Sequence, residues 1–151
     1  MERAEIIEKV KKYFDIDELV CNHILDRFDE ERAWDFLDTI ALLVILILRE
    51  NILQSPMYCN NHKKGVYQRG MRCKMCELVK EKNYAYLSAH LLGKGFDFTV
   101  LGMTAEEARK KIKAMSSILP CQVRIEGGVT WLHIDVLPQH GITQKVYEFT
   151  A

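Results

Sequence analysis

The sequence lacks both a net charge and a long apolar run. Lys+Arg and Asp+Glu each number 21 among 151 residues, so the formal net charge at pH 7 is zero. The global basic field typical of proteins that bind nucleic acid or anionic membranes is therefore absent, although a local basic patch is still compatible with this balance. The most apolar run, Ile40 to Leu48, has nine residues, whereas a helix needs roughly 20 to cross a bilayer. We expect a buried helix there and no transmembrane segment.

A secretory signal and a disulfide framework are also missing from the sequence. Residues 1–5, Met-Glu-Arg-Ala-Glu, lead into a charged amphipathic stretch without an apolar signal core. The five cysteines are odd in number, which favours free thiols or a metal site over disulfides. We therefore expect a protein that is cytoplasmic on synthesis and that reaches any target outside the cell by separate release.

Proline is scarce, and no repeat or linker is visible. The three prolines lie at 56, 120 and 138, and the length suits one domain with its own core. Within this single expected domain, 1–151, we distinguish a helical part (1–50), a loop-rich part (51–87) and an α+β part (88–151).

The helical part shows apolar residues at helical spacing. Ile6, Ile7, Val10 and Phe14 predict a first helix. Asp15 or Asp17 is a candidate cap for a second helix that reaches residue 28, and a third helix is predicted over about 31–49. The third helix is apolar on all sides from 40 to 48, which predicts that it is the most buried.

The last part contains strand and turn signals. Residues 95–100 form a short strand-like run, and Thr104 with Glu107 forms a capping box for a helix that reaches about residue 117. Residues 122–126 and 130–136 flank Gly127-Gly128 as a predicted hairpin, and 144–149 is a candidate final strand. Together these signals predict an α+β fold in which N-terminal helices pack on a small antiparallel sheet.

Three separated residues form a candidate metal site. Catalytic zinc sites commonly use three protein ligands and one water, with histidine nitrogens and a carboxylate oxygen among the ligands. His90, Asp97 and His133 supply such a set, and two glycines between the first two allow the chain to turn. The spacing by itself fits equally well a surface His90, a loop Asp97 and a His133 that is bonded within the sheet.

Two motifs extend this pattern to a known family. Ser88-x-His90-x-x-Gly93-x-Gly95-x-Asp97 and the later Trp131-x-His133-x-Asp135 resemble the zinc D-alanyl-D-alanine carboxypeptidases, which include phage endolysins and L-alanyl-D-glutamate peptidases. The resemblance covers about residues 50–150. It implies a hedgehog/D,D-peptidase-like fold and a catalytic zinc held by His90, Asp97 and His133, with Ser88 at the substrate. The implied function is a metallopeptidase, a peptidoglycan hydrolase of phage or prophage lysis that degrades the cell wall as a carboxypeptidase or endopeptidase.

The general base is where the sequence departs from part of this family. Many members carry Glu or Asp three residues before the second histidine, where this chain has Thr130. Two candidates are left, Glu126 and Asp135. A two-residue Gly-Gly turn sets Glu126 opposite Val129 and on the face of His133, whereas a three-residue turn makes it face away. The Gly-Gly pair favours the two-residue turn, which ranks Glu126 ahead of Asp135. Asp135 shares the face of His133 by strand alternation, but its role can also be only to orient a histidine.

Candidate substrate-binding residues lie before the first motif. The segment Gln68-Arg69-Gly70-Met71-Arg72 is similar to one in phage-type members. Arg69 or Arg72 is expected to pair with a substrate carboxylate or to stabilise an oxyanion; the alternative is a solvated basic loop. Trp131 is expected either to wall the substrate cleft or to lie in the core.

A second, structural metal site is a further hypothesis. Cys59-x-x-His62 and Cys73-x-x-Cys76 resemble a zinc knuckle, which would order the loop-rich part; four unrelated loop residues are the alternative. His23, Cys21, Cys121 and His140 show no partner in the sequence.

Two other functions compete with the peptidase hypothesis. A catalytically inactive zinc-containing module that binds cell walls fits the Thr130 substitution. A nucleic-acid-associated zinc protein is disfavoured by the zero net charge and by the lack of an aromatic stacking stripe. Bacterial peptidoglycan is therefore the expected partner, without nucleic acid, and a monomer is favoured.

Overall fold

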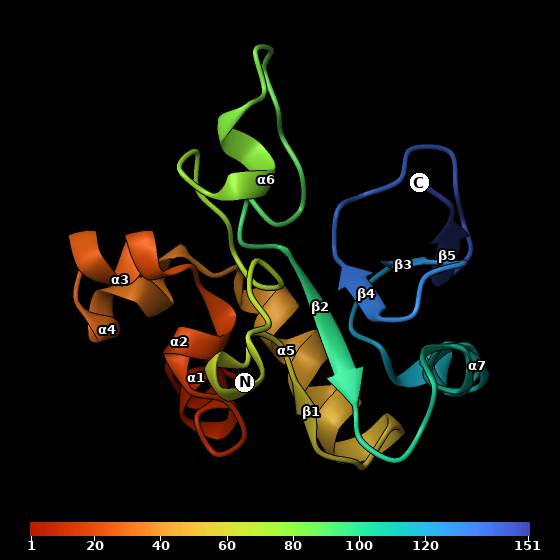
Figure 1. The fold of residues 1–151 in the computed structure, drawn as a ribbon. Helices are drawn as coiled ribbons and strands as arrows, with labels where there is room; N and C mark the ends of the chain where they lie inside the picture. The colour runs from red at the N-terminus through yellow and green to blue at the C-terminus, as the bar shows by residue number, and fades with distance from the viewer.

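The computed structural model describes residues 1–151 as seven α-helices and one five-stranded sheet (Figure 1). The helices are α1 (Arg3–Val10), α2 (Ile16–Leu19), α3 (Asn22–Arg27), α4 (Glu30–Ala33), α5 (Thr39–Ile47), α6 (Glu77–Lys80) and α7 (Ala105–Ala114). The strands are β1 (Met57–Tyr58), β2 (Gly95–Val100), β3 (Val123–Glu126), β4 (Leu132–Asp135) and β5 (Val146–Phe149). None of these helices combines the length and the apolar character that a membrane crossing requires.

The sheet has the strand order β1-β2-β4-β3-β5 and is mixed. β2 and β4 form its centre, with Asp97 paired to His133. β4 pairs antiparallel with β3, while β5 pairs parallel with β3. The expectation of a wholly antiparallel sheet is therefore wrong for β5, because the chain crosses back over residues 136–145 before it joins the edge.

One face of the sheet lies against the helices and forms the core. Phe96 of β2 and Ile134 of β4 are about 1% exposed, and both line a small gap against α5. The ring of Phe14, which follows α1, lies 5.7 Å from that of Phe98. In Figure 1, α5 runs beside β2, and α7 lies at the lower right, below β3 and β4. The polar face that remains is the one that carries the site.

The helix expected to end at residue 28 is in fact two helices. α2 begins with a capping box of Asp15 and Glu18, as one of the two candidate caps predicts. Val20 then leaves the helix and forms a parallel bridge with Met71, and the Cys21 amide donates a hydrogen bond to the Met71 carbonyl at 3.0 Å. This pairing across the chain interrupts the helical pattern.

The helix expected over 31–49 is also interrupted. α4 and a 3-10 turn (Trp34–Phe36) end before Leu37, and α5 restarts with Asp38 as its cap. The Asp38 amide donates a hydrogen bond to the Gly93 carbonyl at 2.9 Å. A π-helical turn (Leu48–Ile52) then extends α5. The prediction of a buried apolar helix at 40–48 is confirmed in position, since five of its residues are buried.

Two elements of the α+β part, β2 and α7, follow the local sequence signals closely. β2 has the predicted bounds, and α7 carries the Thr104–Glu107 capping box in both directions. The predicted two-residue turn is wrong. Arg124 pairs with Asp135 and Ile125 with Ile134, so residues 127–131 form a wider connection between β3 and β4.

Candidate functional site

The polar face of the sheet gathers the residues of both motifs. Asp97 of β2 lies beside His133 of β4, and strand alternation places Asp135 on the same face. His90 reaches this face from the turn that precedes β2. The imidazoles of His90 and His133 have ring centroids 5.3 Å apart. The structure thus brings together the three predicted metal ligands, which are all buried.

The distances within this cluster fit a small divalent ion. His133 Nδ1 lies 2.8 Å from Asp97 Oδ1, and His90 Nε2 lies 3.3 Å from Asp97 Oδ2. The three ligand atoms lie within 4.8 Å of one another. Nitrogen and oxygen ligands at about 2.1 Å from a tetrahedral zinc are about 3.4 Å apart. Because only three protein groups converge, one tetrahedral position is left for a water molecule or substrate.

Each histidine is held by the nitrogen that does not face Asp97. His90 Nδ1 lies 2.9 Å from the Gly70 carbonyl oxygen and donates a hydrogen bond to it. His133 Nε2 lies 2.7 Å from Asp135 Oδ2. Metal-binding histidines commonly donate their second N–H to a carbonyl or carboxylate, which fixes the ring and the tautomer. This arrangement is the feature that best distinguishes the cluster from a chance meeting of polar groups.

The charges in the cluster are strongly coupled. Burial alone raises the pKa of the Asp97 carboxyl, but the hydrogen bonds from His133 and His90 outweigh it and hold this pKa well below its ordinary value. Burial lowers the pKa of His133, yet its bonds to Asp135 and Asp97 dominate and raise it to about 9. The pKa of Asp135 is lowered as well, so both carboxylates are ionised. His133 must release its Nδ1 proton before that nitrogen can bind a metal ion.

Both carboxylate oxygens of Asp135 accept hydrogen bonds from neighbouring groups. Its side chain is inaccessible to solvent, and Arg124 binds both of its oxygens, at 2.8 and 2.9 Å. It also accepts hydrogen bonds from His133 and from the Leu137 amide. These contacts favour the orienting role over that of a general base.

Glu126 lies on the face of the sheet that carries the site, but through a β3–β4 register that differs from the predicted one. Alternation along β3 places it on the side of Arg124, which pairs with Asp135. The expected pairing with Val129 does not occur. Glu126 is half-buried, and its carboxylate enters none of the ion pairs of the structure, while its carbonyl accepts a hydrogen bond from Arg109. Glu126 is therefore a carboxylate on this face that no ion pair engages.

The two candidate arginines both lie at this face. Arg72 Nη2 is 3.6 Å from Asp97 Oδ2, and Arg72 Nε donates a hydrogen bond to the Gln68 carbonyl at 2.6 Å. Arg69 Nη1 lies 2.6 Å from the hydroxyl of Thr99, two residues beyond Asp97. Arg72 is thus the one of the two that contacts the Asp97 carboxylate.

A tight segment positions His90 and these arginines. The Arg72 amide donates to the His90 carbonyl at 3.1 Å, and the Asp97 amide donates to the Arg69 carbonyl at 2.7 Å. Between them, Gly70 has no room for a side chain, since a Cβ there would lie 2.3 Å from the Leu19 carbonyl oxygen. A glycine is required at 70 because two backbones cross there.

The hydrogen bonds of Ser88 are local, and the Trp131 indole makes none. Ser88 Oγ accepts from the Leu91 amide at 3.4 Å, and its carbonyl accepts from the Leu92 amide, so it opens the turn that presents His90. Trp131 is half-buried, and its indole N–H is buried without a hydrogen-bond partner. No contact in the structure assigns either residue to a substrate.

Three further residues complete the site and were missed in the sequence. Arg124 lies with its guanidinium 4.8 Å from the Phe149 ring, and that ring meets His133 edge-on at 5.8 Å. Arg109 of α7, 4% exposed, donates to the carbonyls of Glu126, Val129 and Trp131. Residue type and spacing carry no signal for these roles, because each depends on the pairing of distant elements.

The predicted Cys59–His62–Cys73–Cys76 set is wrong in two of its members. Cys59 is completely buried in the core, and burial raises the pKa of its thiol well above the ordinary value. His62 lies 3.5 Å from Asp17 and stacks near Tyr67. Cys73 and Cys76 instead gather with Cys21 and His23, because the Val20–Met71 bridge brings these segments together.

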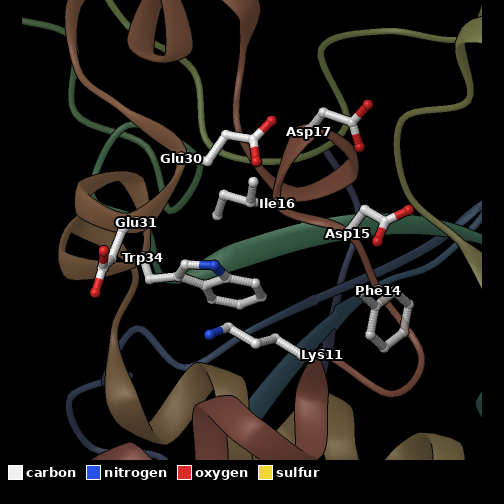
Figure 2. A pocket seen from close by; sticks show the side chains of 8 residues that line it. All are labelled: Lys11, Phe14, Asp15, Ile16, Asp17, Glu30, Glu31 and Trp34. Atoms are coloured by element: carbon white, nitrogen blue, oxygen red, sulfur yellow. The ribbon is translucent and has the colours of Figure 1, made fainter.

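A pocket on the helical part lies away from the His90 cluster. It has a volume of about 610 Å³ and is lined by residues that follow α1 and by parts of α2 and α4. Figure 2 shows Lys11 beside the indole of Trp34, with the carboxylates of Asp15, Asp17, Glu30 and Glu31 around them. It contains no histidine or cysteine, so pocket size does not identify the metal site here.

Comparison of the chain with protein-family models, with curated proteins and with solved structures gave no match.

Proposed function

We propose that this chain is a zinc-dependent peptidase that hydrolyses peptide bonds in the stem peptides of bacterial peptidoglycan. The observation that carries the proposal is the convergence of His90, Asp97 and His133. The second ring nitrogen of each histidine is hydrogen-bonded, to the Gly70 carbonyl and to Asp135 respectively. The two sequence motifs that hold these ligands resemble the zinc D-alanyl-D-alanine carboxypeptidases, and we extend the proposal to the hedgehog/D,D-peptidase-like fold. Action on the wall after release, in phage or prophage lysis, is part of the same proposal.

A zinc ion with an open coordination position acidifies a water molecule and polarises a carbonyl group. His90, Asp97 and His133 would hold this ion. The Gly70 carbonyl and Asp135 would keep the two imidazoles in the tautomers that leave His90 Nε2 and His133 Nδ1 as the coordinating nitrogens. The remaining chemistry falls to side chains on the same face.

Glu126 is the proposed general base. Hydrolysis adds water to the peptide carbon and breaks the C–N bond, and a proton must move from the water to the leaving amine. Glu126 is suited to carry this proton because its carboxylate is unpaired and lies on the face of His133. Asp135 is less suited, since its two oxygens are occupied by Arg124 and His133.

Arg72 is the proposed anchor for the substrate, and Arg69 is the second candidate. The Arg72 guanidinium contacts Asp97 at 3.6 Å, so a carboxylate or a developing oxyanion beside the metal ligands would lie within its reach. A carboxypeptidase requires such a cation for the terminal carboxylate, whereas an endopeptidase would use it at the oxyanion.

The test compares His90→Ala with His140→Ala, a control at an exposed histidine that lies outside the cluster. The zinc-loaded wild-type chain is incubated with purified cell walls, and new amine termini are measured. We expect His90→Ala to lose the zinc of this cluster and to abolish cleavage, while His140→Ala keeps both. Walls without new termini after incubation with the zinc-loaded wild type would overturn the peptidase proposal.

A wall-binding module without turnover is the alternative that Thr130 favours. Thr130 is exposed and lies before β4 begins. Because this residue is a threonine, the chain has no acidic side chain at that position. Sedimentation with cell walls, together with unchanged amine termini, would support this alternative. Loss of turnover in Glu126→Gln with zinc retained would support the peptidase.

A further inference from the structure

We propose that Cys21, His23, Cys73 and Cys76 hold a second, structural zinc ion that joins α3 to the segment 70–76. Each of the four side chains offers one ligand atom, and these atoms lie within 4.8 Å of one another. They come from two regions that are about fifty residues apart in the sequence. The proposal is independent of the peptidase function, since none of the four belongs to the His90 cluster.

The spacing within the cluster fits a tetrahedral thiolate site. Cys76 Sγ lies 3.7 Å from His23 Nδ1. Zinc binds sulfur at about 2.3 Å and histidine nitrogen at about 2.0–2.1 Å, which sets a sulfur and a nitrogen ligand about 3.6 Å apart. All five cysteines of the chain are free thiols in the structure, so no disulfide accounts for the gathering of three of them here.

Backbone amides in the loop point at the sulfurs. The Met75 amide lies 3.4 Å from Cys73 Sγ, and the Cys73 amide lies 3.4 Å from Cys76 Sγ. N–H groups directed at sulfur stabilise a negative charge on it. The Cys73-x-x-Cys76 turn therefore directs two N–H groups at the sulfurs that would bind the ion.

The ligand set is complete, which indicates a structural and not a catalytic ion. Three cysteines and one histidine fill the four tetrahedral positions and leave none for water. Cys21 and Cys76 are 8% and 2% exposed, while His23 and Cys73 are half-buried. Cys21, His23 and Cys76 line a cleft of about 350 Å³. An ion can therefore enter from solvent but is held by protein alone.

The position of this site explains what the ion would stabilise. Cys21 is the residue before α3, and its amide is bonded to Met71. Gly70 and Arg72, on either side of Met71, contact His90. Residues 59–94 contain only short elements, so a metal cross-link at 73 and 76 supplies order that local structure does not.

The first experiment measures metal content in the full chain. We expect about two zinc ions per wild-type chain, one for each cluster. Cys73→Ser with Cys76→Ser should lose one of them, and Cys121→Ser, at a half-buried cysteine outside the cluster, should lose none. His90→Ala should lose the other ion, so failure of the two proposals is distinguishable.

The second experiment uses cobalt in the wild-type chain, which avoids a variant that does not fold. Co²⁺ bound by thiolates gives intense charge-transfer absorption in the near ultraviolet, which a site of histidine and aspartate lacks. We expect this absorption in the wild type and in His90→Ala, and a weakened, shifted band in His23→Gln. Its absence from the wild type, or a disulfide between two of the three cysteines in freshly purified protein, would overturn the proposal.

Discussion

His133 is the residue on which the site depends most, because both of its ring nitrogens are engaged. Asp97 faces one nitrogen at 2.8 Å and Asp135 the other at 2.7 Å. Asp135 is in turn held by both arms of the Arg124 guanidinium. The side chains of Arg124 and Asp135 therefore set the orientation of one proposed metal ligand, His133.

Asp135→Asn tests this chain of contacts. We expect zinc affinity at the His90 cluster to fall about 10–100-fold, because partners behind a metal-binding histidine have effects of this size. Competition with a chromophoric chelator measures the affinity. Asp26→Asn, at an exposed position in α3, should leave it unchanged, and equal affinities in the two variants would contradict the orienting role.

The sequence predicted the ligands of the first cluster but not those of the second. His90, Asp97 and His133 stand in motifs with a recognisable order. Cys21 and His23 stand in a stretch that has the pattern of an ordinary amphipathic helix. Their meeting with Cys73 and Cys76 depends on the Val20–Met71 bridge, which no local pattern announces.

At the scale of elements, α7 supports the connection between β3 and β4. Its capping box, with the Thr104 and Glu107 bonds at 2.7 and 3.1 Å, sets where the helix begins. One turn later Arg109 donates to three backbone carbonyls at 3.2–3.3 Å. The placement of Glu126 therefore owes more to a helix than to a tight turn.

Arg109→Met tests this support. The change leaves three carbonyls without their charged donor, and we expect the free energy of unfolding to fall by about 3 kcal/mol. Denaturant titration measures the fall. Lys110→Met, an exposed neighbour on the same helix, should change it by less than about 0.5 kcal/mol.

Elements with local signals were predicted well, and elements interrupted by distant partners were not. β2 and α7 carry alternation and a capping box within their own residues. The breaks after α2 and before α5 follow from bonds to Met71 and Gly93. The wide connection after β3 likewise reflects Arg109, which the Gly127-Gly128 pair does not reveal.

At the scale of the whole molecule, the helical and α+β parts share one core. Its 33 buried apolar residues run from Ile6 to Ile134. α5 is central to it, since Leu42 is inaccessible to solvent and Phe96 lies against the same helix. We expect the two parts to unfold together.

Leu42→Ala tests this cooperativity. The substitution should lower the free energy of unfolding by about 2–5 kcal/mol, as for other buried leucines, whereas Ile40→Ala, 41% exposed on the same helix, should have a small effect. Trp34 reports on the helical part and Trp131 on the sheet. Single-tryptophan variants, each followed by fluorescence, should show coincident unfolding midpoints, and separate midpoints would contradict a shared core.

The hydrogen bonds from Arg109 have a consequence for which substitutions the chain tolerates. The guanidinium binds main-chain oxygens, which every amino acid supplies, so the side chains at 128–130 do not contribute to the support that holds the connection in place. Gly128 has a φ of +76°, which strains any other residue even though the space around it is open, so the exposed Thr130 is the position where a new side chain is tolerated best. A substitution there would change the surface of the connection while the carbonyls of Glu126, Val129 and Trp131 stay bound to Arg109.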